Sequence, residues 1–173
     1  MIIRRPTGRS GRFALTALAI ALLPALSTAQ FQITTGTGDT TEDFDSLATS
    51  GTGNLWENGT TLEGWFLFRS DGLTLSTYNA GTGTSNAGSY YSFGATDDTE
   101  RALGSAGSGG GHFRNPGNGV VAGWMAFAAT NNSGNALAEF TLGFDGEQWR
   151  NGGNTSPQSL TFEYGFGASF DGV

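Results

Sequence analysis

The chain has 173 residues, with 15 acidic side chains, eight basic ones, one histidine and no cysteine. Without cysteine it can form no disulfide, no zinc–thiolate site and no thiol nucleophile, so a packed core must hold the fold together. The 29 glycines, together with abundant threonine, serine and asparagine, disfavour helices and suit short strands joined by turns.

Residues 1–29 have the pattern of a bacterial export signal. Basic residues come first, at Arg4, Arg5, Arg9 and Arg12, and an apolar stretch follows over residues 13–26. Small residues at 27–29 then predict a signal helix that is cleaved before Gln30 after export through the Sec pathway. An uncleaved anchor is the alternative, but the apolar stretch is shorter than the roughly 20 residues that span a bilayer. The sequence thus predicts a secreted protein, either extracellular or at the cell surface.

The charge beyond the signal is strongly acidic. All 15 acidic residues lie there, and the only cations are Arg69, Arg101, Arg114 and Arg150. Such a surface repels phosphate backbones and anionic lipid headgroups, so we expect no nucleic-acid partner and no membrane contact after signal cleavage. The length of this part suits a single domain over residues 42–173, preceded by a flexible lead-in at 30–41.

The first half of the domain predicts several short strands. Residues 44–48 are expected to form an edge strand and 49–63 a polar loop. The run GWFLFR at 64–69 predicts a strand, and Asp71-Gly72 a turn that leads into a partner strand at 73–78. Further strands are expected at 89–94 and 101–103, and residues 105–119 are expected to form a glycine-rich loop.

The second half of the domain has the clearest alternation of apolar and polar residues. Residues 120–130 predict an apolar strand, 131–134 a tight turn and 137–147 its hairpin partner. In 137–147 Ala138, Phe140, Leu142 and Phe144 fall on one face, and residues 159–167 repeat the pattern. A period of two indicates half-buried strands. The sequence as a whole predicts an all-β, antiparallel β-sandwich of the jelly-roll or concanavalin-like kind, incomplete at its C-terminal edge because the chain ends within the pattern.

Six short segments spread over residues 42–166 carry a family resemblance. They are 43–48 (DFDSLA), 62–66 (LEGWF), 89–94 (SYYSFG), 100–105 (ERALGS), 146–153 (GEQWRNGG) and 160–164 (LTFEY). Together they resemble secreted bacterial β-sandwich modules found in PEP-CTERM-type surface proteins and ahead of the nuclease or phosphatase domains of some extracellular enzymes. The resemblance implies a jelly-roll fold and brings no catalytic residue to this chain. The further strands and the Pro-Glu-Pro tail that usually follow in that group are not found in this sequence.

Catalytic motifs are missing from the sequence. The single histidine, His112, stands in a glycine run, where a solvated loop residue is the expected state. There is no Gly-x-Ser-x-Gly nucleophile elbow and no phosphate-binding loop. Glu139, Asp145 and Glu147 alternate with apolar residues, so we expect them on a solvent face rather than paired across a cleft. We therefore expect no enzyme activity. We expect no cofactor other than a structural Ca²⁺ on the acidic loops, for which solvated loops without a bound ion are the alternative.

After catalytic and metal sites, the remaining candidate is a ligand-binding site made of large aromatic residues. Sugar binding needs exposed rings that stack on the ligand, and the expected ligand-binding residues are Trp149, Arg150, Tyr90, Tyr91 and Trp56. The other interpretation is that Trp149 closes the end of the core and Arg150 pairs with an acid. The sequence favours a non-catalytic exported module, structural or adhesive or glycan-binding, whose partner is extracellular polysaccharide or cell-surface matrix. The alternative is an accessory N-terminal part of an extracellular nuclease, phosphatase or glycosidase.

Overall fold

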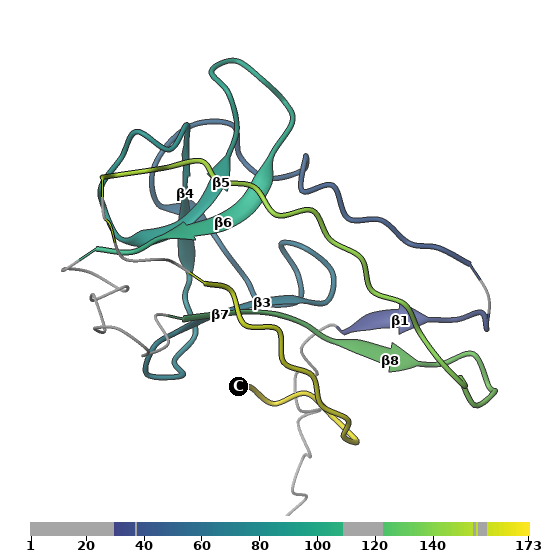
Figure 1. Ribbon diagram of the computed structural model, residues 1–173. Coiled ribbons are helices and arrows are strands. Elements are labelled where there is room, and N and C mark those ends of the chain that lie inside the picture. Colours follow the sequence, from purple (N-terminus) through teal and green to yellow (C-terminus); the bar gives the residue numbers. More distant parts are fainter. Residues whose placement is uncertain (1–29, 37, 109–122, 154, 156–158) are drawn as a thin grey trace, which may run out of the picture.

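The computed structural model describes residues 30–36, 38–108, 123–153, 155 and 159–173, which contain β-strands and no helix (Figure 1). The strands are β1 (Phe31–Ile33), β2 (Asn54–Leu55), β3 (Trp65–Arg69), β4 (Thr77–Gly81), β5 (Ser89–Phe93), β6 (Ala102–Ala106), β7 (Gly123–Phe127) and β8 (Ala129–Asn131). The expected all-β class is therefore confirmed. The predicted signal over 1–29, His112 and Arg114 lie outside the described residues, as does the predicted loop from residue 109 onward.

The strands form one larger sheet and two strand pairs. The larger sheet has the order β2-β4-β5-β6, while β3 pairs antiparallel with β7 and β1 pairs parallel with β8. Within the larger sheet, β4 and β5 are also parallel. The prediction of a purely antiparallel fold is wrong at these two places. At β4 and β5 the reason is that the connection over residues 82–88 runs back along the sheet, so β5 starts level with the start of β4.

The larger sheet and the β3–β7 pair enclose a common core, with β4, β5 and β6 above β3 and β7 in Figure 1. Leu67 of β3, Tyr78 of β4 and Tyr90 of β5 pack in one buried cluster, which Leu103 of β6 and Met125 of β7 adjoin. The Tyr90 hydroxyl lies 2.8 Å from the carbonyl oxygen of Phe68 and 2.7 Å from that of Trp124, and it can donate its proton to either. Burial of apolar surface between the layers, tied by this hydroxyl, stabilises their stacking.

Strand pairing in the first half differs in part from the prediction. The strand at 64–69 and the turn at Asp71-Gly72 are confirmed, and Arg69 donates its amide hydrogen to the carbonyl of Leu73. Beyond an isolated bridge between Phe68 and Thr74, however, the chain leaves β3 and joins the other sheet as β4. This crossing takes Leu75 into the shared core.

The predicted first edge strand is a turn. Residues 44–48 fold back with Phe44 at a φ of 63°, and the Leu47 amide donates to the Phe44 carbonyl. Leu47 is thereby buried, and the Phe44 ring meets Trp65 edge-on at 5.0 Å. The aromatic and apolar residues of the segment thus serve the core without pairing in a sheet.

The predicted hairpin over residues 120–147 is also wrong. Residues 123–127 form β7, but β7 pairs with β3, and β8 pairs with β1. The chain turns at 131–134 as expected, with Gly134 at a φ of 76°. Residues 137–147 and 159–167 are extended but belong to no sheet.

Candidate functional site: an exposed apolar groove

Tyr90 and Tyr91 do not form a surface site, because both are buried. They lie on β5, which has β4 on one side and β6 on the other and is buried along its whole length. Tyr90 faces the shared core, and Tyr91 faces a second cluster with Phe93 and Ala106. The expectation that one of two adjacent tyrosines would be exposed is wrong, because this strand is covered on both faces.

Trp56 is buried as well. Its ring meets Tyr78 edge-on at 5.9 Å, and its indole Nε1–H donates to Asn58 Oδ1 at 2.6 Å. The same Asn58 oxygen accepts the amide hydrogen of Leu67 at 2.8 Å. Trp56 therefore shares the core with Tyr90 and stabilises the loop before β3.

Trp149 and Arg150 fasten the chain to the larger sheet. The Trp149 ring stacks on Phe93 with centroids 6.2 Å apart and planes 6° from parallel, so it is half-buried. The Arg150 guanidinium donates to the carbonyl oxygens of Gly83 and Thr84, at 3.1 and 3.0 Å. Gly83, at a φ of +81°, is needed here because a Cβ on it would collide with the Trp149 carbonyl. Of the five predicted ligand-binding residues, only these two retain accessible surface.

A second aromatic anchor lies near the end of the chain. Phe170 packs against Phe66 at 4.7 Å and against Phe68 at 6.1 Å, on the β3–β7 pair. Trp149 and Phe170 thus attach the two unpaired stretches to different sheets. The residues that precede each anchor are left extended and exposed.

These exposed stretches carry seven of the eleven large hydrophobic side chains that are exposed among the described residues. We call residues 138–144 the first apolar segment and residues 160–166 the second. Their large side chains are 50–85% exposed, namely Phe140, Leu142, Phe144, Leu160, Phe162, Tyr164 and Phe166. Monomeric proteins seldom expose a contiguous surface of this kind without using it for an interaction.

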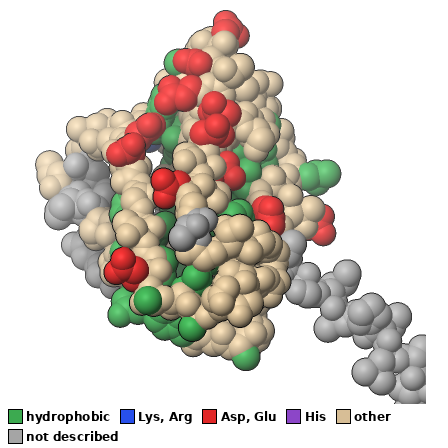
Figure 2. Space-filling model, turned by 90° about the vertical axis from the view of Figure 1, so that its right-hand side faces the viewer, with side chains coloured by type: hydrophobic (Ala, Val, Ile, Leu, Met, Phe, Trp, Pro, Cys, Tyr) green, Lys and Arg blue, Asp and Glu red, His purple; other side chains and the backbone are tan. Residues whose placement is uncertain are grey.

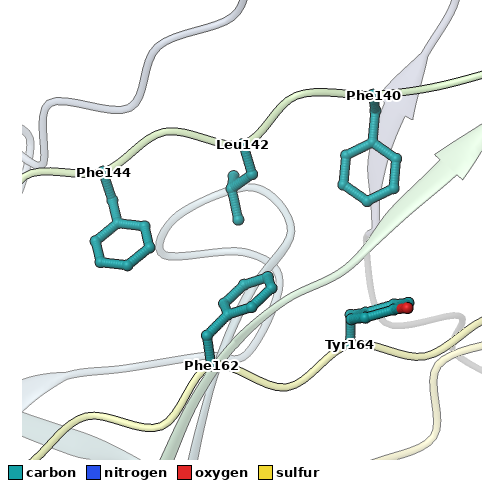
Figure 3. A pocket seen from close by; sticks show the side chains of 5 residues that line it. All are labelled: Phe140, Leu142, Phe144, Phe162 and Tyr164. Atoms are coloured by element: carbon teal, nitrogen blue, oxygen red, sulfur yellow. The ribbon is translucent and has the colours of Figure 1, made fainter.

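The two segments face each other in antiparallel register. The rings of Phe144 and Phe162 lie 6.5 Å apart, as do those of Phe140 and Phe166. Both separations are within the range of aromatic contacts. Figure 3 shows side chains from one segment pointing toward those of the other across an open space. This space, the apolar groove, has a volume of about 470 Å³ and is lined by Phe140, Leu142, Phe144, Phe162 and Tyr164.

Acidic side chains lie beside the groove. Glu139 lies within the first apolar segment, Asp145 follows it directly, and Glu163 lies within the second. All three are exposed, and neither segment contains a basic residue. Figure 2, which looks at the right-hand side of Figure 1, shows acidic side chains spread over that face with apolar ones between them. The groove therefore presents an apolar interior beside negative charge.

The described residues contain no group of three or more His, Cys, Asp or Glu side chains placed to hold a metal ion. Among the same residues, no helix is long and apolar enough to cross a membrane. Comparisons with protein-family models, with curated proteins and with solved structures found no match.

Sequence reasoning identified the alternating residues of the groove but assigned them to a covered sheet face. Residues 145–161 separate the facing positions, so no hairpin turn joins the two segments. That spacing does not exclude pairing, since β3 and β7 pair across a longer connection. No local signal in the sequence therefore distinguishes an exposed segment from a covered strand.

Proposed function

We propose that this protein is a non-catalytic, exported β-sandwich module that attaches to the cell-surface matrix through its apolar groove, in a structural or adhesive role. The observation that carries this proposal is the exposed aromatic surface of the two segments. Exposed clusters of aromatic side chains bordered by charge are typical of interaction sites. The facing sheets with a common core support the sandwich assignment.

Export and attachment belong to the same proposal. The signal pattern of residues 1–29 supports passage to the outside, and the acidic composition suits a solvated extracellular surface. The resemblance to modules of bacterial surface proteins supports the same assignment. Removing the signal leaves Gln30 at the N-terminus, next to β1.

The first experiment follows the full chain in a bacterial host. The expected result is an exported form whose intact mass corresponds to a start at Gln30. A product found only in the cytoplasm, with residues 1–29 retained, would overturn the export part of the proposal.

The second experiment measures sedimentation of the exported protein with cell-wall and exopolysaccharide fractions. We expect a Phe144→Ser, Phe162→Ser double variant to lose at least about three-quarters of the bound fraction, because it removes two facing rings from the groove. Leu73→Ser removes an exposed apolar side chain outside the groove and should bind like the wild type. Equal binding of the wild type and the groove variant, or binding by neither, would overturn the role of the groove.

A further inference from the structure

The backbones of the two apolar segments are unpaired. Among the described residues, none in 136–153 or 159–173 makes a backbone–backbone hydrogen bond. Gly143 and Gly165 have no atom within 4 Å of where a Cβ would lie, so both segments are also open beside their glycines. Extended chain with free N–H and C=O groups is a template for another strand.

The directions of the side chains show where the open backbone edges of the two segments lie. Phe140, Leu142 and Phe144 face the second segment, so their contacts lie between the two segments as between two layers of a sandwich. The hydrogen-bonding edges then run alongside the groove and stay open. An added strand would pair with an edge and place its own apolar side chains in the groove.

The dimensions suit a short strand. Seven residues of extended chain span about 23 Å at about 3.3 Å per residue, which is near the usual length of a strand in globular proteins. The open space of about 470 Å³ leaves room for additional apolar side chains. A partner strand of five to seven residues would therefore cover one segment.

Charge argues against a second copy of this chain as the partner. Antiparallel self-pairing centred on Leu142 would place Glu139 opposite Asp145 twice. Self-pairing of the second segment centred on Glu163 would place that carboxylate opposite its own copy. Like charges directly opposite each other destabilise a strand pair. The same acids favour a partner with basic residues on its outer face.

We propose that the apolar groove accepts, by strand addition, an extended segment of a partner protein in which apolar and basic residues alternate. This inference rests on the proposed function and names the matrix component that the groove engages. The apolar side chains of the partner enter the groove, its main chain pairs with a segment edge, and its cations face Glu139, Asp145 or Glu163.

The test uses three nine-residue peptides and the exported protein, which begins at Gln30, in calorimetric titrations. The first peptide alternates valine with lysine, the second alternates valine with glutamate, and the third is the first with alternate backbone amides N-methylated. We expect the lysine peptide to bind at least about tenfold more tightly than either of the others. Glutamate in place of lysine removes the opposite-charge pairs with the acids beside the groove. N-methylation removes backbone hydrogen bonds between the peptide and the segment edge.

Variants locate the binding. Leu142→Asn with Phe162→Asn should weaken binding of the lysine peptide at least about tenfold, while the control Leu73→Asn leaves it unchanged. Glu139→Gln with Asp145→Asn should reduce the preference for lysine over glutamate. The circular dichroism spectrum and the urea midpoint of each variant show that the sheets remain folded.

Four results would overturn the inference. They are equal binding of all three peptides, no binding of any, a dimer in sedimentation velocity that the groove variant abolishes, or binding of a soluble glycan with no peptide binding. Matrix attachment without peptide binding would leave the proposed function standing and remove only the strand partner. Peptide binding without matrix attachment would leave the strand partner standing and remove the proposed attachment to the matrix.

Discussion

The strand β5 and the first apolar segment differ in what covers them, although both carry large aromatic side chains. β5 has a strand on each side, and all five of its residues are buried. Among the described residues, no strand lies on either side of the first apolar segment, and its large side chains are at least half exposed. Alternating apolar residues therefore make a chain suitable for a sheet, but they do not supply the neighbouring backbone that a sheet requires.

The difference predicts two levels of stability in one molecule. The sheets around Leu67 and Tyr90 should unfold together, because their side chains share a core. The apolar segments, held at Trp149 and Phe170, should contribute little to that transition. Substitutions in each region test this division.

The largest effect is expected in the shared core. Leu67 is 0% exposed, and Leu67→Ala removes apolar contacts between the layers and leaves a cavity. We expect a loss of about 3 kcal/mol in the free energy of unfolding, measured by urea denaturation. Leu73→Ala, at an exposed position after the adjacent turn, is the matched control and should cost less than about 0.5 kcal/mol.

A smaller loss is expected when a methyl group is added where backbones meet. A Cβ on Gly94 would lie 2.5 Å from the Glu100 carbonyl oxygen and collide with the buried Arg101 guanidinium. Gly94→Ala should therefore lower the free energy of unfolding by about 1–3 kcal/mol. Gly143→Ala, in the first apolar segment, meets open space and should be near neutral. Equal effects of the two changes would contradict the difference in packing.

The next largest loss of stability is expected when the Tyr90 hydroxyl, which links the two layers, is removed. Tyr90→Phe leaves the Phe68 and Trp124 carbonyls without this donor and should cost about 1–2 kcal/mol at neutral pH. Burial raises the pKa of Tyr90 well above its ordinary value of 10.0. Above about pH 10 the unfolded chain loses this proton and the folded protein keeps it, so wild-type stability falls by about 1.4 kcal/mol per pH unit.

The pH dependence separates this residue from the other tyrosines. Since Tyr90→Phe has no proton to lose at this position, its stability should fall less steeply above pH 10 than that of the wild type. Urea midpoints measured at intervals from pH 7 to pH 11 give the two curves. Parallel curves over the whole range would show that the Tyr90 hydroxyl is not buried between the layers.

Sequence reasoning predicted the all-β class and the strands at 64–69 and 89–94, because compact aromatic or apolar runs bounded by turns form strands in most settings. The strand expected at 101–103 is present but runs from Ala102 to Ala106, so the predicted loop at 105–119 was wrong at its start. It could not predict that β4 would leave β3 for the other sheet, since partner choice depends on contacts distant in the sequence. Trp56 and Trp149 illustrate the same limit for the site. Both stand in polar sequence, yet one is buried at a loop and the other stacks on Phe93.

The groove shows a different limit. Periodicity gave the face on which Phe140, Leu142 and Phe144 lie, and Figure 3 shows them on one side of their segment. It could not give the exposure of that face, because burial depends on whether another strand or layer covers it. The positions of the groove residues were thus predictable, and their accessibility was not.

The smallest effect is expected in the apolar segments themselves. Leu142→Ala shortens a side chain that is 50% exposed on a segment without backbone pairing. The free energy of unfolding should change by no more than about 0.5 kcal/mol, because little apolar surface is returned to water. Urea denaturation beside Leu67→Ala gives the comparison. A loss above about 2 kcal/mol would mean that the segment folds with the core. The groove would then be part of the interior rather than a surface accessible to a partner.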